Sequence, residues 1–403
     1  MQRPRLRRLA LAALVSLVVA DVAISLFVIQ DGTLGWRSIP PYGAICHPRQ
    51  LVWLAAQHAE LEGRQAPGII AQFDAELGWC NVKARGTAPN APLAFTYNSL
   101  GARSRREYAD APPENVVRLA CFGESFTHGD EVGDDDTWEY QLEQLGDRYE
   151  ALNLGVGGYG TDQALLRFRR EGLHGAQVAC IGFMPENIGR NVNRYRPLWH
   201  PSSNNCVAKP RFVLTGGALQ LVPIPYATRA ELVDAVTTGR VIDDLAEHEY
   251  WGAETRMGWL RFSSCLRLAA AWWAYHRRDV PDLFAEADAE PYTTSVALLE
   301  AFAREATQRG AKFAPVLIFP REDDLLRFAI AHSPYWTGLI AELERRGVTV
   351  IDMTPRIAPA FLAAHDDPSL PRMFAGGHLS GAANAIVARA LREQVDARFP
   401  AGR

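Results

Sequence analysis

Five apolar runs of strand length recur along the C-terminal part of this 403-residue chain. They are Val116–Phe122, Ala151–Val156, Val178–Met184, Phe313–Phe319 and Val348–Met353. Helix-compatible stretches lie between or after several of them: Thr137–Leu145, Thr161–Leu173, Val296–Arg309 and Gly381–Ala397. Strands that alternate with helices form parallel βαβ units with helices on both faces of the sheet. The pattern predicts an α/β fold, a three-layer α/β/α sandwich around a five-stranded parallel sheet with its sites at the carboxyl ends of the strands.

One long interval, from about Arg190 to Thr293, interrupts this alternation after the third run. It is too long for a structureless loop in a compact domain, so we expect it to carry structure of its own. Within it, Trp259–His276 has the apolar spacing of an amphipathic helix. This helix either packs against the sheet or forms a lid or a membrane-facing surface.

The N-terminus has the composition of a membrane segment. Four arginines within the first eight residues precede an apolar run from Leu9 to Ile29, in which only Ser16, Asp21 and Ser25 are polar. A helix of this length spans about 30 Å, the thickness of the hydrocarbon core of a bilayer. The arginines favour the cytoplasmic side. We therefore expect a single-pass membrane protein whose main domain lies on the periplasmic, extracytoplasmic side.

Asp21 leaves a second interpretation open. A carboxylate in the middle of a membrane costs about 2.5–3.5 kcal/mol on insertion scales. In a cleavable signal peptide, Val18 and Ala20 would occupy the cleavage-site positions and Asp21 would become the new N-terminus. Both interpretations export the domain. The anchor is favoured because the apolar run continues beyond the possible cut.

Charge and cysteine content exclude several kinds of partner. The formal net charge of −4 shows no basic excess, which argues against nucleic acid. No cysteines form a C-x-x-C pair and no metal-ligand spacing links the histidines, so we expect no metal and no other cofactor. Cys121 and Cys180 lie in apolar runs and are expected in the core. The others are available for disulfides, with the pairing left open: Cys46, Cys80, Cys206 and Cys265.

The first apolar run leads into the segment Gly123-Glu124-Ser125-Phe126-Thr127-His128-Gly129. A serine just past a strand, flanked by glycines that permit a sharp turn, presents its hydroxyl at the edge of the sheet. Alone, such a serine is more often a cap or turn residue. Three further segments at the same edge supply groups that acyl transfer needs: Asn153–Gly160, Gly182–Asn191 and Gly376–Ser380. Four segments that carry groups needed for acyl transfer, all expected at the same edge of the sheet, favour a catalytic site.

These four segments resemble the four sequence blocks of the SGNH/GDSL hydrolase superfamily, most strongly at Gly123–Gly129 and Asn153–Gly160 and most weakly around His378. The stretch Asn98–Arg103 resembles the lead-in of membrane-anchored bacterial members. The resemblance implies a flavodoxin-like sheet. It divides the chain into an anchor at 1–30, an N-terminal extension at 31–111 and a hydrolase domain at 112–403 with its insertion at about 190–293.

By position, the resemblance implies Ser125 as nucleophile and His378 as general base. It implies an oxyanion hole formed by the backbone N–H groups of Ser125 and Gly158 and the side-chain amide of Asn187. A serine hydroxyl is a poor nucleophile near neutral pH until an imidazole removes its proton. The oxyanion needs fixed donors, and losing one costs about 2.7–4 kcal/mol of barrier. Without a Cβ, Gly158 lets substrate approach its N–H closely.

The chain departs from the superfamily pattern in two places. The acidic residue of the first block is Glu124 instead of the usual Asp. The triad Asp stands two or three residues before the histidine, where this chain has Gly376 and Ala375. A backbone carbonyl could hold the imidazole instead, giving a Ser–His dyad. Because loss of the orienting carboxylate costs about four orders of magnitude in a Ser-His-Asp enzyme, we expect another orienting group, a slow enzyme or an inactive one.

Together these features predict a serine esterase that removes O-acyl groups, in particular acetyl, from a carbohydrate or cell-envelope glycan through an acyl-enzyme on Ser125. Its expected partners are this ester substrate and the membrane. The alternatives are an O-acyltransferase of the same fold, a lipid esterase and a non-catalytic glycan-binding or assembly protein. The missing carboxylate favours the non-catalytic protein. The oxyanion donors Gly158 and Asn187 argue against it, because binding alone would not require them.

Overall fold

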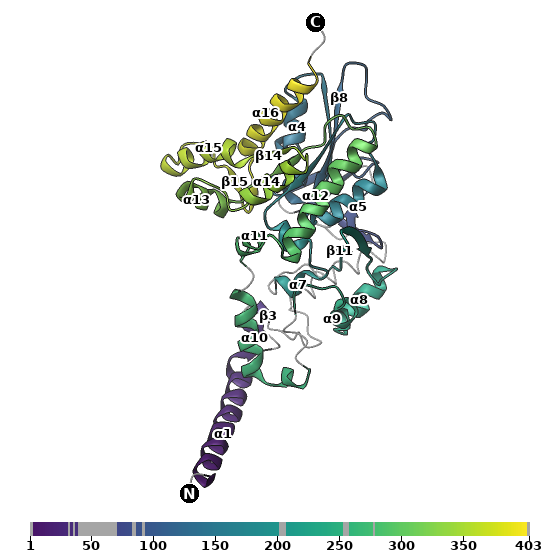
Figure 1. Ribbon diagram of the computed structural model, residues 1–403. Coiled ribbons are helices and arrows are strands. Elements are labelled where there is room, and N and C mark those ends of the chain that lie inside the picture. Colours follow the sequence, from purple (N-terminus) through teal and green to yellow (C-terminus); the bar gives the residue numbers. More distant parts are fainter. Residues whose placement is uncertain are drawn as a thin grey trace. The chain divides into compact units, whose positions relative to one another are not determined.

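The computed structural model describes residues 3–30, 33–34, 37–38, 71–82, 86–90, 93–200, 207–252, 258–276 and 279–400 (Figure 1). The chain forms two compact units. The first comprises residues 1–64, 193–208 and 224–282, and the second comprises residues 65–192, 209–223 and 283–403. Every candidate site residue lies in the second unit.

The second unit is built on a five-stranded parallel sheet, as predicted. In chain order its strands are β8 (Val117–Gly123), β9 (Tyr149–Gly155), β10 (Val178–Phe183), β13 (Val316–Ile318) and β14 (Val350–Asp352). They lie in the order β14-β13-β10-β8-β9, and each neighbouring pair is parallel. This is the flavodoxin-like order, which reverses between β8 and β10. The last two strands are shorter than the apolar runs that predicted them.

Helices cover both faces of this sheet, which confirms the three-layer prediction. They are α4 (Trp138–Glu143), α5 (Thr161–Glu171), α12 (Glu290–Gln308), α13 (Glu322–Ala331), α14 (Thr337–Arg345), α15 (Thr354–Asp366) and α16 (Gly381–Arg398). Leu119 and Cys121 of β8 share a core with α4, α15 and α16. Phe122, on the opposite face, meets Phe168 of α5 and Phe302 of α12 at centroid distances of 5.4 and 6.0 Å. Burial on both faces explains the continuous apolar run.

The interval after β10 carries secondary structure of its own, as predicted. It contains α6 (Asn187–Arg190), α7 (Arg196–Trp199), β11 (Arg211–Thr215), β12 (Ala218–Val222), α8 (Arg229–Thr237), α9 (Val241–Leu245), a 3-10 turn η3 (Gly258–Phe262), α10 (Ser264–His276) and α11 (Asp282–Ala285). The helix predicted over Trp259–His276 is therefore divided at Ser263. α7 to α10 belong to the first unit and the antiparallel β11–β12 hairpin belongs to the second.

The N-terminal part begins with α1 (Arg3–Phe27). Its segment Arg7–Phe27 is long and apolar enough to cross a membrane, and its length and composition suit a signal sequence equally well. Short antiparallel strands follow: β1 (Ile29–Gln30), β2 (Thr33–Leu34), β3 (Arg37–Ser38), the β4 (Ala71–Asp74)–β5 (Gly78–Asn81) hairpin and the β6 (Gly86–Asn90)–β7 (Leu93–Tyr97) hairpin.

Two of the cysteines lie in the core of the sheet, as predicted. Cys121 and Cys180 are buried on neighbouring strands with their sulfur atoms 3.4 Å apart. Within the described part of the chain, Cys80 and Cys265 are also free thiols. Cys46 and Cys206 lie outside the described residues, so a disulfide that involves either of them remains a prediction.

Candidate active site

The serine predicted as nucleophile is the first residue of a four-residue helix, α3 (Ser125–His128), directly after β8. The Glu124 carboxylate caps this helix by accepting the Phe126 N–H at 2.7 Å. Gly129 ends it with a φ of 80°, in the left-handed region that favours glycine. The glycine-flanked segment therefore forms the sharp turn that the sequence predicts.

Glycines at the ends of three adjacent strands make room for α3. A Cβ at Gly123 or Gly182 would overlap the Thr127 side chain, and a Cβ at Gly155 would overlap the backbone of His128. The short helix therefore lies across the ends of β8, β9 and β10, where the strand order reverses. Open α/β sheets bind their ligands at this point.

The hydroxyl of Ser125 is not yet bonded to an imidazole. Ser125 is 4 % exposed, and its Oγ–H donates to Glu124 Oε2 over a long 3.4 Å. Among the hydrogen bonds of the described residues, none joins Ser125 to His378. Burial raises the pKa of Glu124, while its bond from Phe126 N–H and the positive charge of Arg190 oppose that rise. A contact this long is weak, so the hydroxyl can leave Glu124 for a better partner.

The structure nevertheless brings His378 to α3. His378 lies on the antiparallel hairpin of β15 (Phe374–Ala375) and β16 (His378–Leu379), just before α16. Its ring packs on Phe126, the residue after Ser125, with centroids 5.1 Å apart. Its Nδ1 is 3.0 Å from Glu131 Oε2. A neutral ring that donates from Nδ1 leaves Nε2 as its acceptor nitrogen.

Glu131 is a carboxylate that the sequence analysis did not assign. Besides His378 Nδ1, its Oε2 accepts the Gly377 N–H at 2.6 Å. A Cβ at Gly376, where φ is 59°, would fall on this carboxyl group. The Glu131 carboxylate therefore fills the space of a side chain at 376, one of the two positions where the superfamily carries its triad Asp. The sequence leaves open which group orients the His378 ring. In the structure the carboxylate beside that ring comes from the loop that follows Ser125. Its only signal in the sequence is an acidic residue just after the segment Gly123–Gly129.

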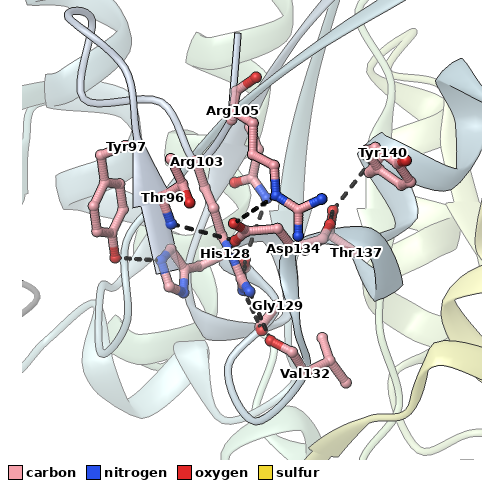
Figure 2. A network of polar contacts seen from close by, with 12 residues as sticks. Thr96, Tyr97, Arg103, Arg105, His128, Gly129, Val132, Asp134, Thr137 and Tyr140 are labelled. Atoms are coloured by element: carbon pink, nitrogen blue, oxygen red, sulfur yellow. Dashed lines mark hydrogen bonds and ion pairs between the residues drawn. The ribbon is translucent and has the colours of Figure 1, made fainter. Parts of the chain in front are cut away.

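A buried arginine fixes the loop that carries Glu131 (Figure 2). The Arg103 side chain, 1 % exposed, pairs with Asp134 at 2.9 Å. It also donates to backbone carbonyls of three loop residues, at 3.0, 2.5 and 2.6 Å: His128, Gly129 and Val132. Bonds from a charged donor are stronger than neutral ones. The lead-in stretch Asn98–Arg103 therefore supports the loop between Ser125 and Glu131.

His128, at the end of α3, is an interior residue. Its Nδ1 is 2.5 Å from Asp130 Oδ1 and its Nε2 is 2.8 Å from the Tyr97 hydroxyl, the second contact being drawn in Figure 2. Burial lowers the pKa of His128, so its neutral ring donates to Asp130 and accepts from Tyr97. Burial alone would raise the pKa of Asp130, but its contact with His128 holds that pKa below its usual range. His128 thus fixes a charged Asp130 and has no free nitrogen for Ser125.

The predicted backbone donor Gly158 lies on the turn after β9, with a φ of 80° that favours glycine. Both turn glycines, Gly157 and Gly158, are partly exposed. Two side chains hold the turn: the Trp79 indole N–H donates to Gly157 O at 3.0 Å, and Arg190 donates to Tyr159 O at 3.1 Å. The turn is therefore fixed from both sides.

The predicted side-chain donor Asn187 begins α6, after β10. It is 0 % exposed, and neither its Nδ2 nor its Oδ1 has a hydrogen-bond partner in the described part of the protein. Each buried polar group without a partner costs about 1–3 kcal/mol, so such an amide needs an explanation. A donor that is kept for a ligand oxygen provides one.

The other charges beside Asn187 neutralise one another. Glu186 bridges Arg190 and Arg321, with nitrogen–oxygen distances of 3.0 Å to each. Among the described residues, no group of three or more His, Cys, Asp or Glu side chains has the arrangement of a metal site. What this edge of the sheet offers is a hydroxyl, an imidazole with its carboxylate, and amide donors.

Comparison with known proteins does not assign the chain to a family. No protein family model matches it, and no curated protein matches it. One solved structure shares 15% sequence identity over 70% of this chain and 97% of its own, with a TM-score of 0.37. A carbohydrate acetylesterase family member from Sinorhizobium meliloti shares 11% identity over 70% of this chain and 99% of its own, with a TM-score of 0.28. Scores this low carry no argument about function.

Proposed function

We propose that this protein is a serine esterase in which Ser125, His378 and Glu131 act as a catalytic triad. The observation that carries the proposal is the position of His378. Its ring packs on Phe126, the residue after Ser125 on α3, and the Glu131 carboxylate lies 3.0 Å from its Nδ1. An imidazole oriented through one nitrogen keeps the other for a hydroxyl, which is the arrangement that makes serine nucleophilic.

In the proposed first step, His378 Nε2 takes the Ser125 hydroxyl proton while Oγ bonds to the carbonyl carbon of the ester. The imidazolium then protonates the departing alkoxide, leaving an acyl group on Oγ. Water, deprotonated by the same nitrogen, releases the acid and restores the hydroxyl. Glu131 remains ionised and stabilises the imidazolium. To reach Nε2, the hydroxyl must turn from Glu124, and the long 3.4 Å contact makes that turn inexpensive.

The negative oxygen of the tetrahedral intermediate is proposed to bind three donors: the backbone N–H groups of Ser125 and Gly158 and the Asn187 amide. The unpartnered, fully buried Asn187 supports this assignment. An amide held without a partner pays its desolvation before the reaction, so the charge that develops meets a donor already in place.

The proposed substrate is an O-acyl ester, in particular an acetyl ester, of a carbohydrate or cell-envelope glycan. Two features support this choice: the resemblance of the four sequence blocks, and an α1 with the length and composition to anchor the chain in a membrane. We propose that α1 spans the membrane with its basic end in the cytoplasm. A sugar hydroxyl in place of water would make the same site an O-acyltransferase, and a lipid ester is the other substrate compatible with an anchor.

Hydrolysis of 4-nitrophenyl acetate by the purified protein tests the proposal. We expect a burst of nitrophenol followed by turnover, and a loss of about three orders of magnitude or more in Ser125→Ala. The matched control is Ser99→Ala, because Ser99 is an exposed serine of the same unit. Equal rates in Ser125→Ala and the parent protein would remove Ser125 from the mechanism.

One observation favours a second candidate, a glycan-binding protein without turnover: Ser125 donates to Glu124 and not to His378. This candidate predicts a folded protein that cleaves no acyl ester. It also predicts polysaccharide binding that is unchanged in Ser125→Ala. The same two variants therefore separate the two functions.

A further inference from the structure

Within the first unit, the one acidic residue of the apolar helix α1 is bound by another helix. Asp21 Oδ1 accepts the Ser263 hydroxyl at 2.7 Å and the Cys265 backbone N–H at 2.8 Å, at the start of α10. From Arg7 to Phe27, every residue of α1 is exposed except Asp21 and Ile24. These two residues, three positions apart, share one helix face. α1 therefore touches the rest of its unit along one narrow line near its C-terminal end.

The position of Asp21 fixes a depth. It stands six residues before Phe27, so it lies about 9 Å inward from the C-terminal end of the helix. Half of a bilayer's hydrocarbon core is about 15 Å thick. If α1 crosses a membrane, Asp21 is inside the leaflet at that end, which we call the outer leaflet. Because the start of α10 holds this carboxylate, it must lie at the same depth.

The surface of η3 and α10 suits such a place. The large apolar side chains there are strongly exposed: Trp259 by 80 %, Phe262 by 77 %, Trp272 by 64 % and Trp273 by 48 %. Apolar surface gathered in this way marks an interaction site and not an ordinary wetted surface. Tryptophan is the residue that collects at the boundary between acyl chains and water.

The length of α10 places its two tryptophans at that boundary. Trp272 is eight residues past Ser264, about 12 Å along the helix. Figure 1 shows α10 continuing past the C-terminal end of α1. The roughly 12 Å from Ser264 to Trp272 are longer than the roughly 9 Å from Asp21 to the end of α1, so Trp272 lies beyond that end. Arg261 of η3 and Arg267 of α10 are the two charged residues of this stretch. Arg267 is half-buried, and a long arginine stem lets a guanidinium reach the headgroups.

We propose that η3 and the first turns of α10 enter the outer leaflet beside α1, with acyl chains covering Trp259 and Phe262 and headgroups surrounding Trp272 and Trp273. This inference rests on the proposal that α1 remains in the protein as a membrane span. The occupant is lipid because the helix that carries these exposed side chains is bonded directly to α1, the proposed membrane span. On this account Asp21 docks α10 within the membrane, and its cost to insertion is offset by the two bonds it accepts.

Quenching of tryptophan fluorescence by brominated lipid tests this. The full chain is reconstituted into vesicles of phosphatidylcholine and phosphatidylglycerol, with bromine on part of the phosphatidylcholine acyl chains. α1 contains no tryptophan. We expect clear quenching of the parent protein. In the triple variant Trp259→Phe/Trp272→Phe/Trp273→Phe, at least half of this quenching should be lost. The buried Trp336 provides the control, Trp336→Phe, which should leave the quenched part unchanged. Asp21→Leu, which cannot accept either bond, should reduce quenching, and Asp21→Asn should retain it.

Alkaline carbonate extraction and ester hydrolysis are measured on the same vesicles. If carbonate leaves the chain in the membrane but the triple variant is quenched as strongly as the parent protein, this inference is overturned and the anchor is not. A chain that carbonate extracts overturns the anchor as well. Absent quenching together with a cross-linked dimer shows that a second copy covers the tryptophans, which also overturns it. Ester hydrolysis reports separately on the proposed function, so failure of the membrane inference can be distinguished from failure of the proposed function.

Discussion

The serine side of the candidate site is buried among three strand ends and tied down by Arg103, whereas its histidine side is a short hairpin held to one carboxylate. Ser125 is 4 % exposed. The side chains of His378 and Glu131 are 22 % and 45 % exposed. An exposed ion pair adds at most about 1 kcal/mol to stability, so the fold gains little from joining His378 to Glu131. Changes on the histidine side should therefore affect catalysis alone, and changes on the serine side should affect the fold as well.

The largest expected effect is on the histidine side. His378→Asn should lower kcat by about four to six orders of magnitude, because the base is lost. Its free energy of unfolding should change by less than about 0.5 kcal/mol, as for other partly exposed positions. Ester turnover and urea denaturation measure the two quantities. A large loss of stability in this variant would show that the hairpin belongs to the fold and not only to the site.

Next comes the carboxylate itself. Glu131→Gln keeps the shape of the side chain but removes its charge, and should lower kcat by about three to four orders of magnitude with stability unchanged. Glu131→Ala/Gly376→Asp moves a carboxylate back to the histidine's own hairpin, into the space that the Glu131 carboxyl group vacates. Aspartate tolerates the positive φ there better than most residues.

The kcat of this double variant should be at least about tenfold higher than that of Glu131→Ala, because a carboxylate again faces the imidazole. Gly376→Asp alone places two carboxylates in one space and serves as the control. Full activity in Glu131→Gln would refute a positioning role for Glu131.

On the serine side, stability should fall together with activity. Arg103→Met removes the 2.9 Å partner of the buried Asp134, which keeps only a 3.6 Å contact with Arg105, and removes donors from three carbonyls, at a cost of about 3 kcal/mol. The neighbouring Arg105 pairs with Asp135 at 2.6 Å on the surface, so Arg105→Met should cost at most about 1 kcal/mol. Thermal denaturation of the two variants, followed by circular dichroism, compares the contribution of the buried arginine with that of the exposed arginine to the stability of the same loop.

The smallest effect is a dependence on pH. The pKa of Asp130 is lower in the folded protein than in the unfolded chain, because its contact with His128 outweighs burial. The resulting stability is fully present above the unfolded value of about 3.9 and is lost as pH falls through the lowered folded pKa. Asp130→Asn should be less stable by about 1–2 kcal/mol at pH 7. Unfolding curves between pH 7 and pH 2 should show that difference shrinking below about pH 4; a constant difference would contradict a hydrogen bond from His128 to an ionised Asp130.

The two sides of the site also differ in how well the sequence predicts them. Ser125, Gly158 and Asn187 each follow a buried strand within a few residues, so an apolar run and its terminal residues suffice to place them at one edge. The Glu131–His378 contact joins residues 247 positions apart. No local pattern encodes such a contact, and it depends on the space that Gly376 leaves open.

The fold shows the same division between local and long-range information. β8, β9, β10 and β13 are buried throughout and therefore give continuous apolar runs, whereas the residues of β14 are only partly buried. The ends of β13 and β14 fall inside their runs, because apolar residues beside a short strand are also buried by the helices that cover it. The predicted helix breaks at Ser263, whose hydroxyl accepts the Leu266 N–H at the start of α10 and donates to Asp21, a partner that periodicity cannot reveal.

The rate at which a fluorophosphonate labels Ser125 tests the triad most directly, because it reports the nucleophilicity of the hydroxyl without needing the natural substrate. Intact mass and peptide mapping should show one adduct on Ser125 in the parent protein near neutral pH. Labelling should be slower by at least about two orders of magnitude in folded Glu131→Gln, since the base loses its orienting charge. No adduct on the folded parent protein, or equal labelling rates in the two proteins, would contradict the account.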